Sequence, residues 1–285
     1  MSRGLKEAFV FIAPLVLFVS FFILFPVFGT VWNSLWQDIP FITRQFILFN
    51  NYIRLLNDQQ FWQATLFTIL FALLSVCLEM IFGTITALVL NEKFHLRGVM
   101  RGIALIPWAI PSVVGARAWQ LIYRYDYGLA NWILQTMGIP SVNWLGSSLG
   151  AFTALILADV WRTTPFVAII ILAGLQTVPK DILDQAQVDG ANMFRRFFKI
   201  TVPMIKPIII VALLFRTIDA LRVFDLVYVI TGGGPGGATI SLSLYGYKFF
   251  LLGDFGYGSA VSITLFVIAF IFAMIYIKIG KFRSR

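Results

Sequence analysis

The sequence has few of the side chains on which thiol and metal chemistry depend. Its 285 residues include one cysteine, Cys77, and one histidine, His95. A single cysteine cannot form a disulfide within the chain, and one histidine cannot build a multi-histidine metal site. We therefore expect this chain to bind no metal ion and no cofactor of its own.

Charged residues are also scarce. They make up 12% of the chain, whereas 59% of the residues are hydrophobic and the mean hydropathy is +0.87. These values lie far outside the range of soluble globular domains and predict an all-α polytopic membrane protein. The Lys and Arg behind the net charge of +9 are spread over segments that flank apolar runs, where they set topology. We expect no nucleic-acid partner.

Six apolar runs are long enough to cross a bilayer as helices, which takes about 20 residues each. We place the spans at about 9–32, 64–90, 103–123, 149–175, 207–230 and 258–280. We interpret the chain as one domain, 1–285, with a polar, basic loop at 179–206. Pro107 and Pro111 predict a bend or a break in the third span.

An even number of spans places both termini on one side of the membrane. The segments on that side, including 179–206, carry 14 Lys and Arg, and the segments on the opposite side carry 4. Cytoplasmic segments are enriched in these residues. We therefore expect both termini and the 179–206 loop in the cytoplasm.

The 179–206 loop carries signals for two short helices. Residues 181–187 are helix-forming with a carboxylate in the first turn, Gly190 permits a break, and Asn192 can cap a second helical turn that contains Phe194. Aromatic side chains on such helices need either a partner or the rest of the bundle to cover them. Periodicity alone leaves both interpretations open.

The same loop follows a long spaced pattern, E-A-A-x-x-D-G-A, then an aromatic residue, then I-x-x-P-x-x-x-P. The positions of this pattern are occupied by Asp184, Ala186, Asp189, Gly190, Ala191, Phe197, Ile200, Pro203 and Pro207. Asp184 replaces the glutamate, and Gln185 replaces the first alanine. The loop resembles the EAA loop of permease subunits in binding-protein-dependent ABC importers. The resemblance implies that these residues, together with Phe194, couple the chain to an ATPase subunit.

The resemblance extends over nearly the whole chain. The strings IPWAIPS, GLANWIL, WRTTPF and VFDLVYVITGGGPGGAT occur in the family's order. They resemble the first permease subunit of heterodimeric sugar importers of the maltose and glycerol-phosphate type. This implies a type I importer fold, with six helices, in the cytoplasmic (inner) membrane of a bacterium or archaeon. The implied partners are a second homologous permease, two ATPase subunits carrying ATP and Mg, an extracytoplasmic solute-binding protein, a sugar and membrane lipid.

The glycine-rich string at 231–239 is not a nucleotide site. It follows an apolar helix instead of a strand, and it lacks the Lys-Ser/Thr pair of a phosphate-binding loop. Composition favours a flexible outer loop. Because nothing else in the sequence resembles an enzyme site, we expect a transport subunit that leaves ATP hydrolysis to its partners.

Two apolar spans carry charged residues at helical spacing. The spacing i, i+3, i+4, i+7 is shared by Asp159, Arg162, Thr163 and Phe166 in the fourth span, and by Arg216, Asp219, Ala220 and Val223 in the fifth. Each set can form a buried ion-pair network or line a sugar pathway. The resemblance places the family's sugar contacts on these two faces, and we prefer that interpretation. We interpret Arg222, Asp225 and Glu79 as structural.

Two other functions remain open. The same kind of importer could carry glycerol phosphate or another polar solute, with the intramembrane arginines as anion ligands. An ion-coupled transporter could instead use Asp159, Asp219 and Glu79 as relay groups. The second model gives the EAA-like loop no role.

Overall fold

The computed structural model describes residues 3–280, of which residues 3–10 are described by their backbone alone. The chain divides into two compact units. The first comprises the chain up to Trp62 together with Tyr245–Phe266, and the second comprises Gln63–Leu244 and the chain from Val267 onward. That the whole chain acts as one domain stays a prediction.

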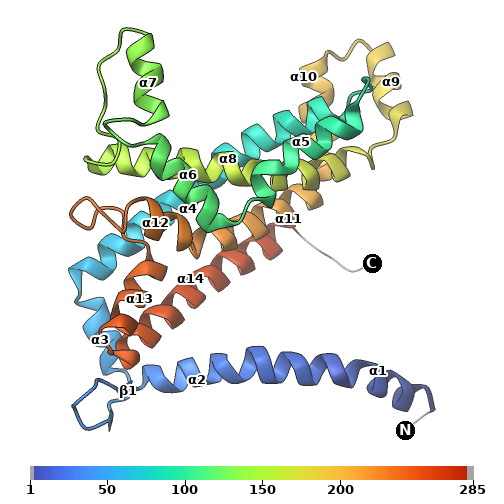
Figure 1. Ribbon diagram of the computed structural model, residues 1–285. Helices are drawn as coiled ribbons and strands as arrows, with labels where there is room; N and C mark the ends of the chain where they lie inside the picture. The colour runs from blue at the N-terminus through green and yellow to red at the C-terminus, as the bar shows by residue number, and fades with distance from the viewer. Residues whose placement is uncertain (1–2, 281–285) are drawn as a thin grey trace. The chain divides into compact units, whose positions relative to one another are not determined.

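The first unit contains two helices, a small hairpin and a short third helix (Figure 1). Its elements are α1 (Arg3–Val19), a π-helical turn (Ser20–Leu24), α2 (Phe25–Ser34), β1 (Trp36–Gln37), β2 (Gln45–Phe46) and α3 (Asn50–Leu56). The π-helical turn lies just before Pro26, which has no N–H to offer the carbonyl of Phe22. π-helix occurs mostly as single turns of this kind inside α-helices.

Three helices belong partly to each unit: α4 (Gln59–Asn91), α13 (Leu242–Leu251) and α14 (Phe255–Gly280). Within the first unit, Asp58 accepts hydrogen bonds from the hydroxyls of Tyr245 and Tyr257. Burial alone would raise the pKa of Asp58, but these bonds and the amides of Gln60 and Phe61 hold it below its ordinary value. The carboxylate therefore stays ionised and joins segments that are far apart in sequence.

The second unit contains most of the helices. Besides its parts of α4, α13 and α14, it is built from α5 (Arg97–Ala109), α6 (Ser112–Ile122), α7 (Leu129–Thr136), α8 (Ser148–Leu175), α9 (Lys180–Val188), α10 (Met193–Arg196), a π-helical turn (Phe197–Thr201), α11 (Val202–Leu221) and α12 (Asp225–Ile230). Helix α8 packs against α5 and α11, and α6 packs against α12. Figure 1 shows α7 at one end of α8 and α9 and α10 at the other.

The apolar core of the second unit lies among α4, α8 and α11. Its buried members are Ala87, Leu90, Val167, Ile171, Leu172, Leu175, Val178, Ile205 and Ala212. At Gly83 of α4, an added Cβ would lie 2.6 Å from the side chain of Val167 on α8. Small residues let helices in a membrane protein approach this closely, so Gly83 sets the distance between α4 and α8.

The number of helices long and apolar enough to cross a membrane agrees with the sequence. Within residues 3–280, five single helices qualify: Phe11–Ser34, Gln59–Asn91, Ser148–Leu175, Met193–Leu221 and Phe255–Gly280. A sixth span forms if α5 and α6 count as one; they are bent by 86° at Ile110 and Pro111. The expected break in the third span is therefore confirmed.

The fifth span differs from the sequence-based prediction at both of its ends. Its helix begins at Met193, well before 207, because a π-helical turn accommodates Pro203 and the helix continues through Pro207. It ends at Leu221 instead of 230, and the chain turns before starting the separate helix α12. The irregular part of the 179–206 loop is correspondingly shorter than expected.

Candidate functional site

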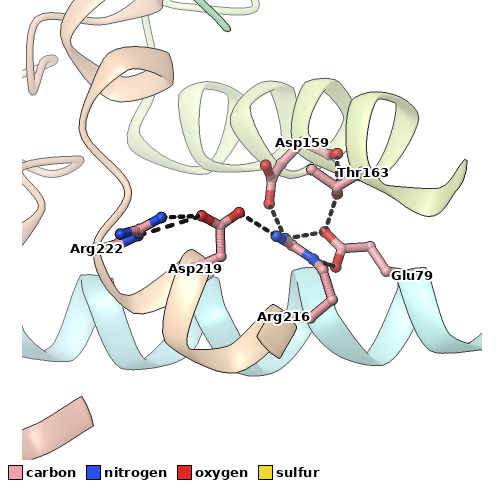
Figure 2. A network of polar contacts seen from close by, with 6 residues as sticks. All are labelled: Glu79, Asp159, Thr163, Arg216, Asp219 and Arg222. Atoms are coloured by element: carbon pink, nitrogen blue, oxygen red, sulfur yellow. Dashed lines mark hydrogen bonds and ion pairs between the residues drawn. The ribbon is translucent and has the colours of Figure 1, made fainter. Parts of the chain in front are cut away.

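Arg216 of α11 lies at the centre of a buried group of charges. Its side chain is 2% exposed. Nε donates to Oε2 of Glu79 at 2.6 Å, Nη2 donates to Oε1 of Glu79 at 2.8 Å, and Nη1 donates to Oδ2 of Asp219 at 2.6 Å. Nη2 also lies 3.3 Å from Oδ2 of Asp159 (Figure 2). The guanidinium thus contacts three carboxylates through all three of its nitrogens.

Glu79 joins this group from α4 and is fully buried. The hydroxyl of Thr163 lies 2.6 Å from both Oε1 of Glu79 and the carbonyl oxygen of Asp159 on α8. Carboxylates buried at this depth are tolerated only when paired and hydrogen-bonded. The group therefore ties α4, α8 and α11 together, and these contacts agree with the interpretation of Glu79 as structural, which stays a prediction.

A polar cavity of about 220 Å³ opens beside this group. Its lining comes from α6, α8, the end of α11 and the start of α12, and consists of Ser112, Asp159, Arg162, Asp219, Ala220, Arg222, Val223, Phe224, Asp225 and Leu226. Asp219 bridges the buried and open parts, because its second oxygen pairs with Nη2 of Arg222 at 3.2 Å. The Arg222 side chain is 71% exposed, so its charge remains open to solvent or to a ligand.

Two further groups complete the wall of the cavity. Nε of Arg162 is buried without a hydrogen-bond partner in the described structure, and Arg162 makes no ion pair within 4.0 Å with the carboxylates whose side chains are described. Ser112, the first residue of α6, donates a hydrogen bond to Asp225 in the first turn of α12. Arg162 therefore offers unused donors, whereas Asp225 is already held.

The structure separates the eight residues expected to contact a sugar. Five of them line the cavity: Asp159, Arg162, Asp219, Ala220 and Val223. Arg216 and Thr163 are not among the lining residues. Arg216 donates to Glu79, and the hydroxyl of Thr163 hydrogen-bonds to Glu79 and to the carbonyl oxygen of Asp159. Phe166 stacks on Trp108 of α5 with ring centroids 5.7 Å apart and is not among the cavity residues.

Part of the cavity was not expected from the sequence. Arg222 and Asp225, interpreted from the sequence as structural, both line the cavity. The reason is that α11 ends at Leu221 and the chain turns before α12, so helical spacing no longer applies. The residues at this turn, Leu-Arg-Val-Phe-Asp, include neither proline nor glycine. No local signal marked the break.

The EAA-like segment has the expected local geometry. Asp184 and Ala186 lie on α9, and Gly190 follows it with a φ of +79°, which favours glycine. Oδ1 of Asn192 accepts a hydrogen bond from the amide of Arg195 at 2.8 Å, so it caps α10 as predicted. Asp189 and Ala191 flank Gly190, Ile200 lies in the π-helical turn, and Pro203 lies at the start of α11.

The aromatic residues of this segment differ in exposure. The Phe194 side chain on α10 is 75% exposed, and Val188 on α9 and Met193 on α10 are also exposed. Phe197 is partly buried and lines an apolar cavity of about 610 Å³ with residues of α4, α11 and α14. Val188, Met193 and Phe194 are thus uncovered apolar side chains, and Phe198 in the π-helical turn is exposed as well.

Comparison with known proteins identifies the family. Residues 79–279 match the model of the binding-protein-dependent transport system inner membrane component. The chain belongs to this family. It is accordingly a multi-pass membrane component of a binding-protein-dependent transport system, and the resemblance found in the EAA-like loop is confirmed.

Individual members of the family are similar over almost the full length. The chain is 51% identical over 282 residues to the trehalose/maltose transport system permease protein MalF of Thermococcus litoralis, covering 99% of this chain and 96% of that protein. It is 39% identical to the sulfoquinovosyl glycerol transport system permease protein SmoG of Agrobacterium fabrum, covering 97% and 91%. A chain in the crystal structure of a bacterial alginate ABC transporter in complex with a periplasmic protein superposes with a TM-score of 0.84 at 23% identity, covering 97% and 94%. The fold is therefore that of an ABC importer permease.

Proposed function

We propose that this chain is a permease subunit of an ATP-driven, binding-protein-dependent importer of sugars. The polar cavity between α6, α8, α11 and α12 is the observation that carries the proposal, because it sets unused hydrogen-bond donors beside carboxylates within apolar spans. Sugar hydroxyls pair well with carboxylates and guanidiniums. The name of the 51% identical relative, which specifies trehalose and maltose, supports a disaccharide or oligosaccharide.

The charges of the cavity favour a neutral sugar over an anion. Arg216 cannot serve as an anion ligand, because Glu79, Asp159 and Asp219 occupy it. The remaining arginines, Arg162 and Arg222, face the carboxylates of Asp159, Asp219 and Asp225 across a small cavity. An incoming phosphate would meet these carboxylates and be repelled. Glycerol phosphate and related anions are therefore the second candidate substrates.

The proposed complex contains a second homologous permease, two ATPase subunits and an extracytoplasmic solute-binding protein. ATP and Mg bind to the ATPase subunits, and this chain acts without an enzyme site of its own. Val188, Met193 and Phe194 supply an uncovered apolar surface at the EAA-like segment, which suits a groove in an ATPase. The periplasmic protein in the structurally similar alginate transporter complex agrees with the binding-protein partner.

A continuous helix can transmit a conformational change from the ATPase contact to the cavity. A single helical segment runs from Met193, next to the proposed ATPase contact, to Leu221, at the edge of the cavity. Its 29 residues give a length of about 43 Å at 1.5 Å per residue. A shift of α9 and α10 that accompanies ATPase closure would be transmitted along α11, and the cavity would then alternate between the two sides of the membrane.

Reconstitution of the complete complex in proteoliposomes tests the proposal. We expect uptake of a labelled disaccharide that requires the binding protein and internal ATP and is competed by neutral disaccharides but not by glycerol phosphate. Uptake that persists without ATP and collapses with the ion gradient would establish ion coupling instead. Competition by the phosphate at equal or lower concentration would assign the cavity to anions.

A further inference from the structure

A third cavity lies in the second unit, at the end of α5 that the charge count assigns to the cytoplasm. It measures about 300 Å³ and lies between α5 and α8. Its walls are apolar along most of their length, with Leu105 on α5 and Ile169 and Leu172 on α8. Arg101 and Gln176 provide the polar groups at one end. On α8 it extends from Pro165 to Gln176, which corresponds to about 16 Å of helix.

Arg101 is only partly used by the protein. Nη2 donates to the carbonyl oxygen of Leu90 near the end of α4 at 3.0 Å. Nε is buried and has no hydrogen-bond partner in the described structure. A buried donor of a charged group is costly when unsatisfied. The bond to the α4 carbonyl thus uses only part of the hydrogen-bonding capacity of the guanidinium.

The residues around Arg101 add further positive charge. Arg97 stands one turn earlier on α5, so the two arginines occupy the same helix face and repel each other. Lys93 precedes them in the connecting turn. No carboxylate of the described side chains lies within 4.0 Å of these three cations. An added Cβ at Gly98 or Gly102 would meet nothing within 4 Å, so the protein leaves this end of α5 open.

We propose that the groove between α5 and α8 binds an anionic phospholipid, whose phosphate is held by Arg101 and Arg97 and whose acyl chain lies along Leu105, Ile169 and Leu172. A basic end next to an apolar trough at the cytoplasmic border of a membrane protein is complementary to that amphiphile. A free phosphate would satisfy the arginines and leave the apolar trough empty. The site is separate from the polar cavity, so it does not depend on which solute is transported.

The test uses the complete transporter complex in nanodiscs of phosphatidylcholine with added phosphatidylglycerol. We expect native mass spectrometry to detect retained phosphatidylglycerol that excess phosphatidylcholine does not displace. Arg101→Gln should reduce its affinity about fivefold, and Arg97→Gln with Arg101→Gln should reduce it about 25-fold. Lys278→Gln removes another exposed cation near the same membrane surface, and this control should leave the affinity unchanged.

Two further measurements keep the proposal testable if an arginine variant fails to fold. Ala173→Trp fills the trough without changing charge, because Ala173 lines the groove and is exposed, and it should also lower phosphatidylglycerol retention. A photo-cross-linking residue at position 173 should label lipid. Cross-linking to the second permease, displacement by inorganic phosphate, or equal retention of phosphatidylcholine would each overturn the proposal.

Discussion

The guanidinium of Arg216 combines two properties that are rarely found together, full burial and contact with three carboxylates. Such a group gives little net stability relative to apolar packing, yet breaking it is expensive. The cost arises because the partners that remain keep their charges in an environment that solvates them poorly. Arg216 is thus better placed to fix the register of α4, α8 and α11 than to bind a solute.

We therefore expect Arg216→Gln to destabilise the protein by about 3–5 kcal/mol. The substitution leaves Glu79 and Asp159 facing each other without a cation. Adding Glu79→Gln removes one of these charges and should recover part of the loss. Thermal unfolding of the purified complex measures both effects. An unchanged melting temperature in the single variant would show that the buried network is not structural.

Arg162 has the opposite character, because its Nε has no hydrogen-bond partner although it lines the polar cavity. Arg162→Gln should raise the substrate concentration for half-maximal uptake by about tenfold or more, since a charge-assisted hydrogen bond contributes about 1.5–3 kcal/mol. Assembly and thermal stability should be nearly unaffected. Arg117→Gln is the matched control, because Arg117 is exposed on α6 and pairs with Gln120. Equal effects of the two variants on uptake would remove Arg162 from the binding site.

The α9–α10 segment and the turn after it contain Phe194, which lies outside the spaced pattern, and Phe197, which occupies its aromatic position, and the two differ in exposure. Phe194 is uncovered, whereas Phe197 faces an apolar cavity beside α4 and α11. The pattern also does not include Val188 and Met193, whose exposed side chains enlarge the surface around Phe194. The segment is therefore better described as a capped pair of short helices with one apolar face than as a loop.

Phe194→Ala should release the ATPase subunits during purification while the chain still inserts in the membrane. An aromatic buried at an interface contributes about 1.5–3 kcal/mol, enough to weaken the joint by about tenfold or more. Phe197→Ala should instead lower thermal stability and retain the ATPase.

Gly190→Asp should also uncouple the ATPase subunits from this chain, because a side chain is strained at a φ of +79°. Asp184→Ala should have the same effect more mildly. ATPase retention by the Phe194 variant, measured by co-purification and by substrate-stimulated hydrolysis, would argue against this surface as the joint.

The orientation of the whole molecule in the membrane decides on which side the glycine-rich loop and the EAA-like segment lie. The glycine-rich loop supplies Gly236 and Ala238 to a cavity that also contains Ser148, the first residue of α8. The EAA-like segment follows the other end of α8. A helix of 28 residues is long enough to cross the bilayer, so the two segments should lie on opposite faces.

Cysteine labelling tests this arrangement in a Cys77→Ser background. Cysteines at Gln187 and Ala238, both exposed, should react with a membrane-impermeant thiol reagent from opposite sides of intact cells and inverted vesicles. The Gln187 position should be accessible only from the cytoplasm, as the charge asymmetry predicts. Labelling of both positions from one side would contradict the six-span topology.

Some properties of this protein follow from local sequence. Apolar runs of about 20 residues determine that the chain enters a membrane, and Pro107 with Pro111 determines the break between α5 and α6. Gly190 and Asn192 determine how α9 ends and α10 begins, because backbone angles and capping depend on neighbouring residues. The spaced pattern from Asp184 to Pro207 was sufficient to identify the family.

Other properties were decided only by the packing of distant segments. Glu79 and Arg216 are 137 residues apart, and helical spacing within one span cannot predict a partner on another. The end of α11 at Leu221 brings Arg222 and Asp225 to the cavity, and no residue at that turn signals the break. The contacts of a side chain therefore depend on the helix that packs against it: Arg216 pairs with Glu79, whereas Nε of Arg162 has no hydrogen-bond partner among the described residues.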